Sequence, residues 1–178
     1  AGSIDYLINE SADWVRTFSR NAATDSSDAV HYNPAGTAMM EDGVHVSFHN
    51  QVFLKNYRMS VTNPTAMGTG TNASEYQSDL STPFLPSLFA VYKKDDLALY
   101  TAFTVPAGGG AVDYKDGVPF FMSLPVAMGL ALGRDIDLVP HSSSFEATSM
   151  FPSVSAGGAY RILSFLSVSA GGRYVYGY

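Results

Sequence analysis

Hydrophobic and polar residues alternate along several stretches of this chain. Within residues 44–54, apolar side chains fall at nearly every second position, and polar ones such as His45 and Ser47 lie between them. A period of two is typical of a β-strand whose two faces meet different surroundings. The pattern therefore predicts an all-β fold. The same alternation recurs in residues 97–105, 153–162 and 166–176.

The less apolar positions of these strands carry Ser, Gly, Ala, Thr and His rather than Lys and Glu. Charged residues make up 15% of the chain, whereas an average soluble domain has about 25%. A soluble sandwich usually places more charge on its wet face. Small polar groups suit the crowded interior of a membrane barrel, whose other face meets lipid. We therefore expect a transmembrane antiparallel β-barrel.

The turns predict hairpins. The sequence VSAGGAY at residues 154–160 recurs as VSAGGRY at residues 168–174, and only a short connection separates the copies. Two such strands joined by a tight turn are typical of a β-hairpin. A second tight turn is expected at residues 93–96, and long connections at residues 63–74 and about 106–149. Short turns at one end and long loops at the other are typical of outer-membrane barrels.

Residues 1–43 lack the alternation. Their middle part, RNAATDSSDAVHYNPAG, is small, polar and rich in alanine, and it ends in a turn signal. Residues 11–18 predict a short helix with Ser11 as its N-cap and with Trp14 and Phe18 on one face. We interpret residues 1–43 as a plug inside the barrel. The alternative is a flexible periplasmic leader with one short helix.

Two groups of residues support the plug interpretation. Small side chains keep the segment slim enough to pack against the inner faces of the strands: Ala22, Ala23, Ala29 and Ala35. Polar side chains can satisfy inward-pointing polar groups: Asp25, Ser26, Ser27 and Asp28. Pro34 fixes its own backbone and pushes Asn33 toward extended geometry, which predicts the turn into the first strand.

Composition excludes several functions. A net charge of −6 argues against a nucleic-acid partner. The absence of cysteine removes disulfides, thiolate catalysis and cysteine-based zinc sites. No run reaches the roughly 18 apolar residues of a transmembrane helix. The chain begins with Ala1 rather than Met, as expected of a secreted protein after removal of a signal peptide.

No enzymatic motif is found in the sequence. There is no G-x-S-x-G elbow, and the glycines at 108–110 lack the Lys-Ser/Thr of a phosphate loop. His45 and His49 share a strand face, and we interpret them as interior polar residues rather than metal ligands. The acidic residues of DID at 135–137, with Glu146, match no calcium loop, and solvated charge is expected there. We expect no enzyme, no cofactor and no metal.

Four stretches in order resemble the N-terminal part of the FadL-type outer-membrane transporters of long-chain fatty acids and other hydrophobic compounds. They are an opening segment that ends in NPAG at 33–36, a strand that ends in VPAG at 105–108, a long and partly apolar insertion, and the final FPSVSAGGAYRILSFLSVSAGGRYVYGY. The resemblance implies a Gram-negative outer-membrane location and a barrel of about fourteen strands with an N-terminal plug, or hatch. This chain supplies the first four or five strands.

The resemblance also implies a mechanism for uptake of fatty acids or similar hydrophobic molecules. The substrate is captured in an apolar loop groove and passes the plug to a lateral opening in the barrel. The groove residues are Phe120, Phe121, Met122, Leu124, Val126 and Met128. The plug and gate residues are Ala1, Gly2, Ser3, Asn33, Pro34, Ala35 and Gly36. The strand interruption at the lateral opening comprises Pro106, Gly108, Gly109 and Gly110.

Several alternatives stay open at the level of sequence. The chain is interpreted as a fragment of the larger barrel, or else as a complete barrel of about eight strands. The run at 118–130 packs over the barrel mouth or forms another strand if it is not a groove. A structural or adhesive outer-membrane barrel is the alternative function. Besides membrane lipid or lipopolysaccharide, the expected partner is a hydrophobic small molecule. Its carboxylate would need a cation, and the candidates are Arg58, Arg134, Arg161 and Arg173.

Overall fold

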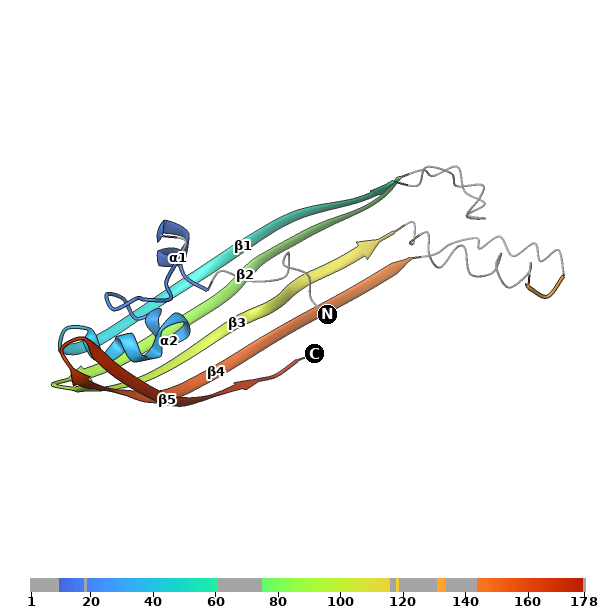
Figure 1. Cartoon of the computed structure of the whole chain (residues 1–178). Helices are drawn as coiled ribbons and strands as arrows, with labels where there is room; N and C mark the ends of the chain where they lie inside the picture. The colour runs from blue at the N-terminus through green and yellow to red at the C-terminus, as the bar shows by residue number, and fades with distance from the viewer. Residues whose placement is uncertain are drawn as a thin grey trace. The chain divides into compact units, whose positions relative to one another are not determined.

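The computed structural model describes residues 10–17, 19–60, 75–115, 118, 131–133 and 144–177. Five strands form one sheet in the order β1-β2-β3-β4-β5, so that each strand lies beside its neighbour in sequence (Figure 1). The strands are β1 (Gly43–Ser60), β2 (Glu75–Lys94), β3 (Leu97–Tyr114), β4 (Phe145–Leu163) and β5 (Leu166–Val175). The helices are α1 (Ala12–Thr17), α2 (Ala29–Tyr32) and the 3-10 helix η2 (Pro34–Met39). The predicted antiparallel, all-β character of the chain is confirmed.

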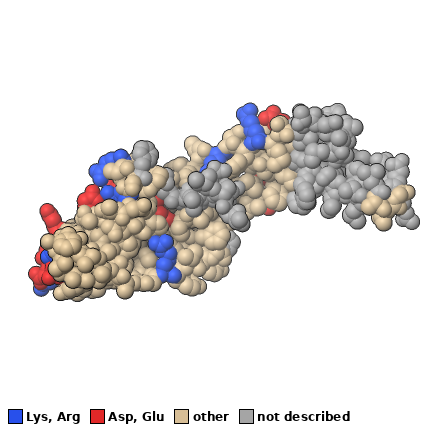
Figure 2. All heavy atoms as spheres, viewed as in Figure 1, with Lys and Arg blue, Asp and Glu red and all other residues tan. Residues whose placement is uncertain are grey.

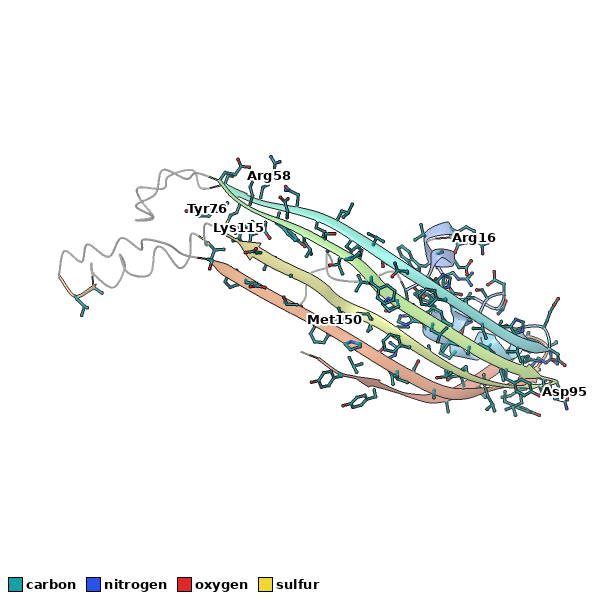
Figure 3. All side chains as sticks on the ribbon, turned by 180° about the vertical axis from the view of Figure 1, so that it is seen from behind. Arg16, Arg58, Tyr76, Asp95, Lys115 and Met150 are labelled. Atoms are coloured by element: carbon teal, nitrogen blue, oxygen red, sulfur yellow. The ribbon has the colours of Figure 1, made fainter. Side chains whose placement is uncertain are left out.

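Both predicted hairpins are present. Strands β2 and β3 pair antiparallel up to Lys94 opposite Leu97, and Asp95 takes a left-handed φ of 52° in the turn. Asp tolerates this conformation better than most residues. Figure 3 shows Asp95 at this turn. Strands β4 and β5 pair with Gly157 opposite Gly171, so the two copies of the repeated sequence lie side by side.

The chain divides into two compact units. Unit 1 comprises Ala1–Val52, Thr82–Gly109 and Ser149–Tyr178, and unit 2 comprises Phe53–Ser81 and Gly110–Thr148. Among the described residues, none of the helices has both the length and the apolar character needed to cross a membrane.

In unit 1, one face of the sheet is covered and the other is bare. The helices α1 and α2 lie on the covered side (Figure 1). Residues from the N-terminal segment and the strands form the core there: Val30, Ala38, Met40, Phe89, Val91, Ala98, Tyr100, Ala102 and Ala159. Strands β1 and β2 alternate between more covered and exposed positions along most of their length. The exposed face of the sheet is apolar, whereas a soluble antiparallel sheet usually turns its polar face to water.

The bare face is strongly apolar. Val44 keeps 71% of its surface exposed and Phe48 keeps 60%. Other exposed apolar side chains on this face of unit 1 are Val46, Val52, Phe84, Leu88, Tyr92, Leu97, Leu99, Phe103, Val154, Tyr160, Ile162, Leu166, Val168 and Tyr174. Among the outward strand positions that the structure describes in unit 1, Lys94 beside the turn is the one charged residue. Monomeric soluble proteins rarely expose a contiguous apolar patch larger than a few hundred Å².

Charge gathers instead at the end of unit 1 where β2 turns into β3 (Figure 2). Lys93 is buried and donates from Nζ to Asp42 over 2.8 Å, and it also donates to the Asp95 carbonyl. Asp42 accepts a second hydrogen bond from the backbone N–H of Asp95 at 3.1 Å. The hydrogen bond from Lys93 lowers the pKa of Asp42. These hydrogen bonds join Asp42, at the end of the N-terminal segment, to the β2–β3 hairpin.

The side chain of Asn50 accommodates an irregularity in β2. Covered positions are even-numbered up to Leu80 and odd-numbered from Leu85, as expected where a β-bulge adds one residue. Asn50 on β1 donates from Nδ2 to the Pro83 carbonyl at 3.1 Å and accepts from the Leu85 N–H at 3.0 Å. Its carboxamide thus serves both backbone groups in place of a peptide group.

Two sequence-based boundaries are wrong. The long connection was expected to begin at residue 106, but β3 continues through Pro106 and Gly110 to Tyr114. It was expected to end near residue 149, but β4 begins at Phe145. Proline and glycine in a strand indicate an end or an irregularity, and sequence alone does not distinguish the two.

The irregularity is at Gly108. Its φ of +86° is one that side chains rarely adopt, and a Cβ there would lie 2.6 Å from the Ser149 carbonyl oxygen of β4. The backbones of β3 and β4 therefore approach closely at this point. Gly108 is required both for its conformation and for the lack of a side chain.

Unit 2 is more polar on its exposed side. Asn56 donates to Asp79, and Arg58 lies 3.8 Å from Glu75. Its core consists of Tyr76 and Tyr114, with Tyr57, Val112, Val118 and Phe145 packed against them.

Candidate functional site

The N-terminal segment, residues 10–42, contacts the covered face of the sheet in unit 1. Ser27 and Ser47 of β1 share a hydrogen bond of 2.6 Å between their hydroxyls. Ser87 of β2 donates to Glu10 at 2.9 Å, and Ser167 of β5 donates to the Ala35 carbonyl at 2.8 Å. Polar residues on the covered face thus bind a polar segment, which is the role predicted for Ser27.

Asp28 connects several residues of the N-terminal segment through hydrogen bonds. It is fully buried, and its carboxylate accepts from Arg20 at 2.6 and 3.0 Å and from the Ser11 hydroxyl at 2.6 Å. Arg20 is also buried and reaches Asp25 at 2.7 Å. The hydrogen bond to Asp28, more than any other contact, raises the pKa of Arg20, while the hydrogen bond from Arg20 lowers the pKa of Asp25. A two-point arginine–carboxylate pair fixes geometry as well as charge.

The predicted N-cap and turn are both observed. The Ser11 hydroxyl accepts from the N–H of Trp14 at 3.0 Å, which confirms Ser11 as the N-cap of α1. Asn33 has a φ of −146° and precedes Pro34 at the first position of η2. Its Nδ2 donates to the Ala23 carbonyl at 3.1 Å, and a Cβ on Gly36 would collide with that carbonyl. The NPAG sequence therefore forms a turn that packs on Ala23.

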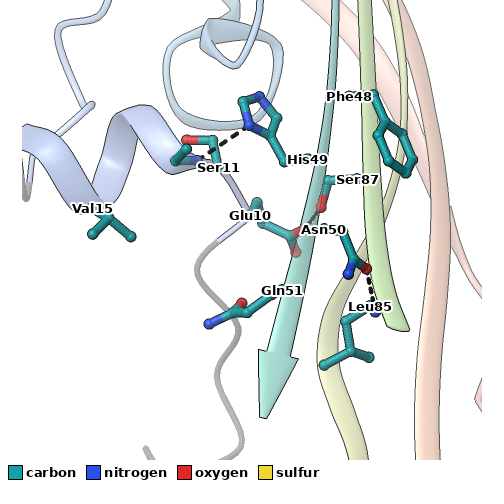
Figure 4. A pocket seen from close by; sticks show the side chains of 10 residues that line it. Glu10, Ser11, Val15, Phe48, His49, Asn50, Gln51, Leu85 and Ser87 are labelled. Atoms are coloured by element: carbon teal, nitrogen blue, oxygen red, sulfur yellow. Dashed lines mark hydrogen bonds between the residues drawn. The ribbon is translucent and has the colours of Figure 1, made fainter. Parts of the chain in front are cut away.

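A pocket of about 460 Å³ opens beside Glu10 (Figure 4). Its lining comes from the N-terminal segment and from β1 and β2: Glu10, Ser11, Ala12, Val15, Phe48, His49, Asn50, Gln51, Leu85 and Ser87. Glu10 is 2% exposed. Its Oε2 accepts from Ser87, and its Oε1 has no hydrogen-bond partner in the described part of the chain. Glu10 is not predictable from the sequence, because no motif surrounds it.

Burial raises the pKa of Glu10 to about 7. The Ser87 hydroxyl, the charge of Arg173 and the backbone of Val105 each oppose that increase. Burial also raises the pKa of the neighbouring Tyr32 to about 12. The Tyr32 hydroxyl accepts from the Glu10 N–H at 3.2 Å. Glu10 thus titrates near neutral pH in a largely desolvated position.

A second pocket of about 380 Å³ contains Arg173. It lies between the segment and the β4–β5 hairpin, and its lining comprises Val30, Pro34, Tyr100, Ser155, Ala156, Ser169, Gly171, Gly172 and Arg173. Arg173 is 3.3 Å from Nδ1 of His31. Burial, with the charge of Arg173, lowers the pKa of His31 to about 4, so His31 is neutral at pH 7 and accepts this hydrogen bond.

The structure distinguishes among the arginines that sequence left unranked. Arg161 pairs with Asp96 at 2.7 Å, and Arg58 pairs with Glu75. Arg134 lies outside the described residues. Among the described arginines, Arg173 is the one with no carboxylate within 4.0 Å, and its polar neighbour is a neutral histidine. Arg173 is therefore the best placed to receive a carboxylate from elsewhere.

The two predicted interior histidines lie on the covered side of β1. His49 accepts from the Ala12 N–H at 3.3 Å, and its other ring nitrogen lies 3.2 Å from the Ser47 hydroxyl. His45 contacts the Glu41 carbonyl at 2.9 Å. Within the part of the chain that the structure describes, no group of three His, Asp or Glu side chains is arranged to hold a metal ion.

Two sets of predicted site residues lie outside the described residues. They are the groove set, Phe120, Phe121, Met122, Leu124, Val126 and Met128, and the first gate set, Ala1, Gly2 and Ser3. The remaining gate residues, Asn33–Gly36, lie in the turn described above. Pro106, Gly108, Gly109 and Gly110 lie within β3.

No protein-family model, curated protein or solved structure matches this chain.

Proposed function

We propose that these strands form part of the wall of an outer-membrane β-barrel that takes up hydrophobic small molecules, such as long-chain fatty acids. In this proposal the N-terminal segment is the plug. The observation that carries it is the surface of unit 1, where many large apolar side chains are exposed on one face of the sheet, while the core and the polar network lie on the other face. In water such a bare face would be unfavourable by about 25 cal/mol for each Å² of apolar area.

The polar residues on the bare face support contact with lipid. Asn50 makes two hydrogen bonds to the backbone of β2, and Thr101 donates to the Ser155 carbonyl at 3.0 Å. Hydrocarbon offers no hydrogen-bond partner, so a polar side chain there must be satisfied within the protein. Both side chains meet that condition.

The length of the apolar run also agrees with a membrane. Exposed apolar residues on β1 extend from Val44 to Leu54. At about 3.3 Å per residue, this stretch is about 33 Å long. A strand tilted by roughly 40° would then cover roughly 25 Å, the height of the apolar band of outer-membrane barrels.

The proposed path for a fatty acid combines sequence and structure. The apolar run at 118–130 is the proposed capture groove, and Arg173 is the proposed partner of the carboxylate beneath the plug. The proposed lateral exit remains at Pro106–Gly110. Its physical support is the irregular backbone of Gly108, with φ +86°, and the missing N–H of Pro106.

The test is binding of a fluorescent long-chain fatty acid to the intact protein in detergent. We expect saturable, stoichiometric binding that Phe121→Ala and Met122→Ala weaken, since both remove apolar area from the groove. Arg173→Gln should weaken binding of the acid more than binding of its methyl ester, because the ester carries no charge. Arg161→Gln is the matched control, since Asp96 already pairs with Arg161. Absence of binding would favour the structural or adhesive alternative.

A further inference from the structure

Most polar atoms that line the pocket beside Glu10 are already hydrogen-bonded within the protein. The remaining ones determine whether the pocket offers donors or acceptors to a ligand. The Ser87 hydroxyl donates to Glu10. The Asn50 carboxamide is used at both ends by the backbone of β2. Ser11 donates to Asp28 and accepts from the N–H of Trp14. Both ring nitrogens of His49 have partners.

Among the residues that the structure describes, two lining atoms have no hydrogen-bond partner, and both are acceptors. They are Oε1 of Glu10 and Oε1 of Gln51, each buried. A carboxamide can rotate and present its NH₂ group instead, so Gln51 does not decide the polarity of the pocket. An ionised carboxylate has no donor at all. When it is ionised, Glu10 therefore requires a donor from the ligand.

The rest of the lining is apolar. Val15 and the buried Leu85 contribute apolar side chains to the pocket. Its volume of about 460 Å³ is within the usual range for small-molecule sites, roughly 300–1,000 Å³. A buried acid beside apolar walls matches a molecule with a donor at one end and a hydrocarbon chain at the other.

We propose that this pocket binds the ammonium end of an apolar amine. An ammonium supplies three donors and a positive charge, which satisfies Glu10 and leaves a donor for Gln51. This proposal rests on the proposed function, because it adds a second class of hydrophobic substrate. The two pockets would then differ in sign: the Arg173 pocket receives an anionic head group and the Glu10 pocket receives a cationic one.

The titratable and charged groups that face Glu10 come from three elements. They are Tyr32 on α2, His49 on β1 and Arg173 on β5. Since burial raises the pKa of Glu10 to about 7, its carboxyl group is partly protonated at neutral pH. An ammonium favours the ionised carboxylate, so its affinity should increase as the pH rises from about 5 to about 8.

The experiment compares three probes with the same six-carbon chain, namely hexylamine, 1-hexanol and hexanoate. Binding to the intact protein in one detergent is measured by calorimetry at pH 5, 6, 7 and 8. We expect hexylamine to bind roughly tenfold or more tightly than hexanoate at pH 8, as expected for a charged hydrogen bond. Glu10→Gln should remove that preference and its pH dependence while leaving 1-hexanol binding in place.

Two control variants separate the causes. Glu41→Gln makes the same chemical change at an exposed position outside the pocket lining and should change nothing. His49→Gln removes the other ionisable lining side chain and should leave the pH dependence intact. Equal or tighter binding of hexanoate, no effect of Glu10→Gln, or no binding of any probe would each overturn the proposal. Fatty-acid binding at Arg173 is measured separately, so failure here leaves the proposed function to its own test.

Discussion

At the scale of single residues, the buried pair of Arg20 and Asp28 holds the N-terminal segment in its fold. Both side chains are almost entirely covered, whereas Asp25, the second partner of Arg20, is 59% exposed. Removal of one member of a buried pair leaves an uncompensated charge, which costs about 3–5 kcal/mol. An exposed ion pair contributes about 1 kcal/mol or less.

We therefore predict that Asp28→Asn greatly destabilises the segment and that Asp25→Asn has little effect. The measurement is hydrogen exchange of the backbone amides of residues 29–33. Asp28→Asn should accelerate their exchange by roughly 100-fold or more, the equivalent of about 3 kcal/mol. Similar exchange rates in the two variants would show that the pair does not hold the segment.

Glu10 and His31 give the segment two opposite pH dependences. The pKa of Glu10 is raised from 4.5 to about 7 by burial, so its contribution to stability is present below pH 4.5 and is lost as the pH rises through 7. The pKa of His31 is lowered from 6.5 to about 4 by burial, so its contribution is present above pH 6.5 and is lost as the pH falls through 4. Between about pH 4.5 and 6.5 the two slopes oppose each other.

Single substitutions should reveal each slope. Glu10→Gln leaves the His31 slope, so the segment becomes more stable as the pH rises from 4.5 to 6.5. His31→Gln leaves the Glu10 slope, so stability decreases over the same range. Limited proteolysis of the segment at a series of pH values measures both. The same pH profile in both variants would contradict the assignment.

At the scale of elements, the β4–β5 hairpin depends on glycines that admit the side chain of Tyr100. Gly157 and Gly171 lie opposite each other. A Cβ on Gly171 would lie 2.7 Å from the Ala156 carbonyl oxygen and 2.8 Å from the Tyr100 hydroxyl. The neighbouring Gly172 has open space around it. The repeated Gly-Gly sequence therefore contains one glycine that the packing requires and one that it does not.

We predict that Gly171→Ala destabilises the hairpin by about 1–3 kcal/mol, the usual cost of overpacking. Gly172→Ala should be neutral or slightly stabilising, because it restricts the unfolded chain without a clash. Thermal unfolding in detergent compares the two variants, which differ by one position in the same dipeptide. Equal melting temperatures would contradict the required contact with Tyr100.

Local sequence patterns predicted the strands, turns and helix cap well. Contacts between residues far apart in the sequence could not be predicted from such patterns. The hairpins at 93–96 and 161–165 follow from alternation and repeated sequence, and Ser11 follows from capping chemistry. The end of β3 was misplaced, because Pro106 and Gly108 interrupt the pattern without ending the strand. The position of Glu10 beside Ser87, 77 residues away, has no local signature, and neither has the contact between Arg173 and His31.

At the scale of the whole molecule, the question that decides the proposed function is whether the bare apolar face of unit 1 contacts lipid or water. Covered positions such as Ser47, Ser87 and Tyr100 contact the segment or lie in the core. Outward positions such as Leu99 and Val168 keep about half of their surface exposed, 52% and 49%. The proposed plug, ligand pockets and uptake all require lipid on the outward side.

The most direct test measures that contact with lipid one position at a time. The chain has no cysteine, so Val46→Cys, Leu99→Cys and Val168→Cys each give a single site for a spin label in lipid bilayers. We predict that these labels are accessible to oxygen dissolved in lipid and protected from a water-soluble nickel reagent. Labels at Ser47→Cys and Ser87→Cys should be shielded from both. Outward labels that the nickel reagent reaches freely, or a purified chain that is monomeric in water without detergent, would contradict the account.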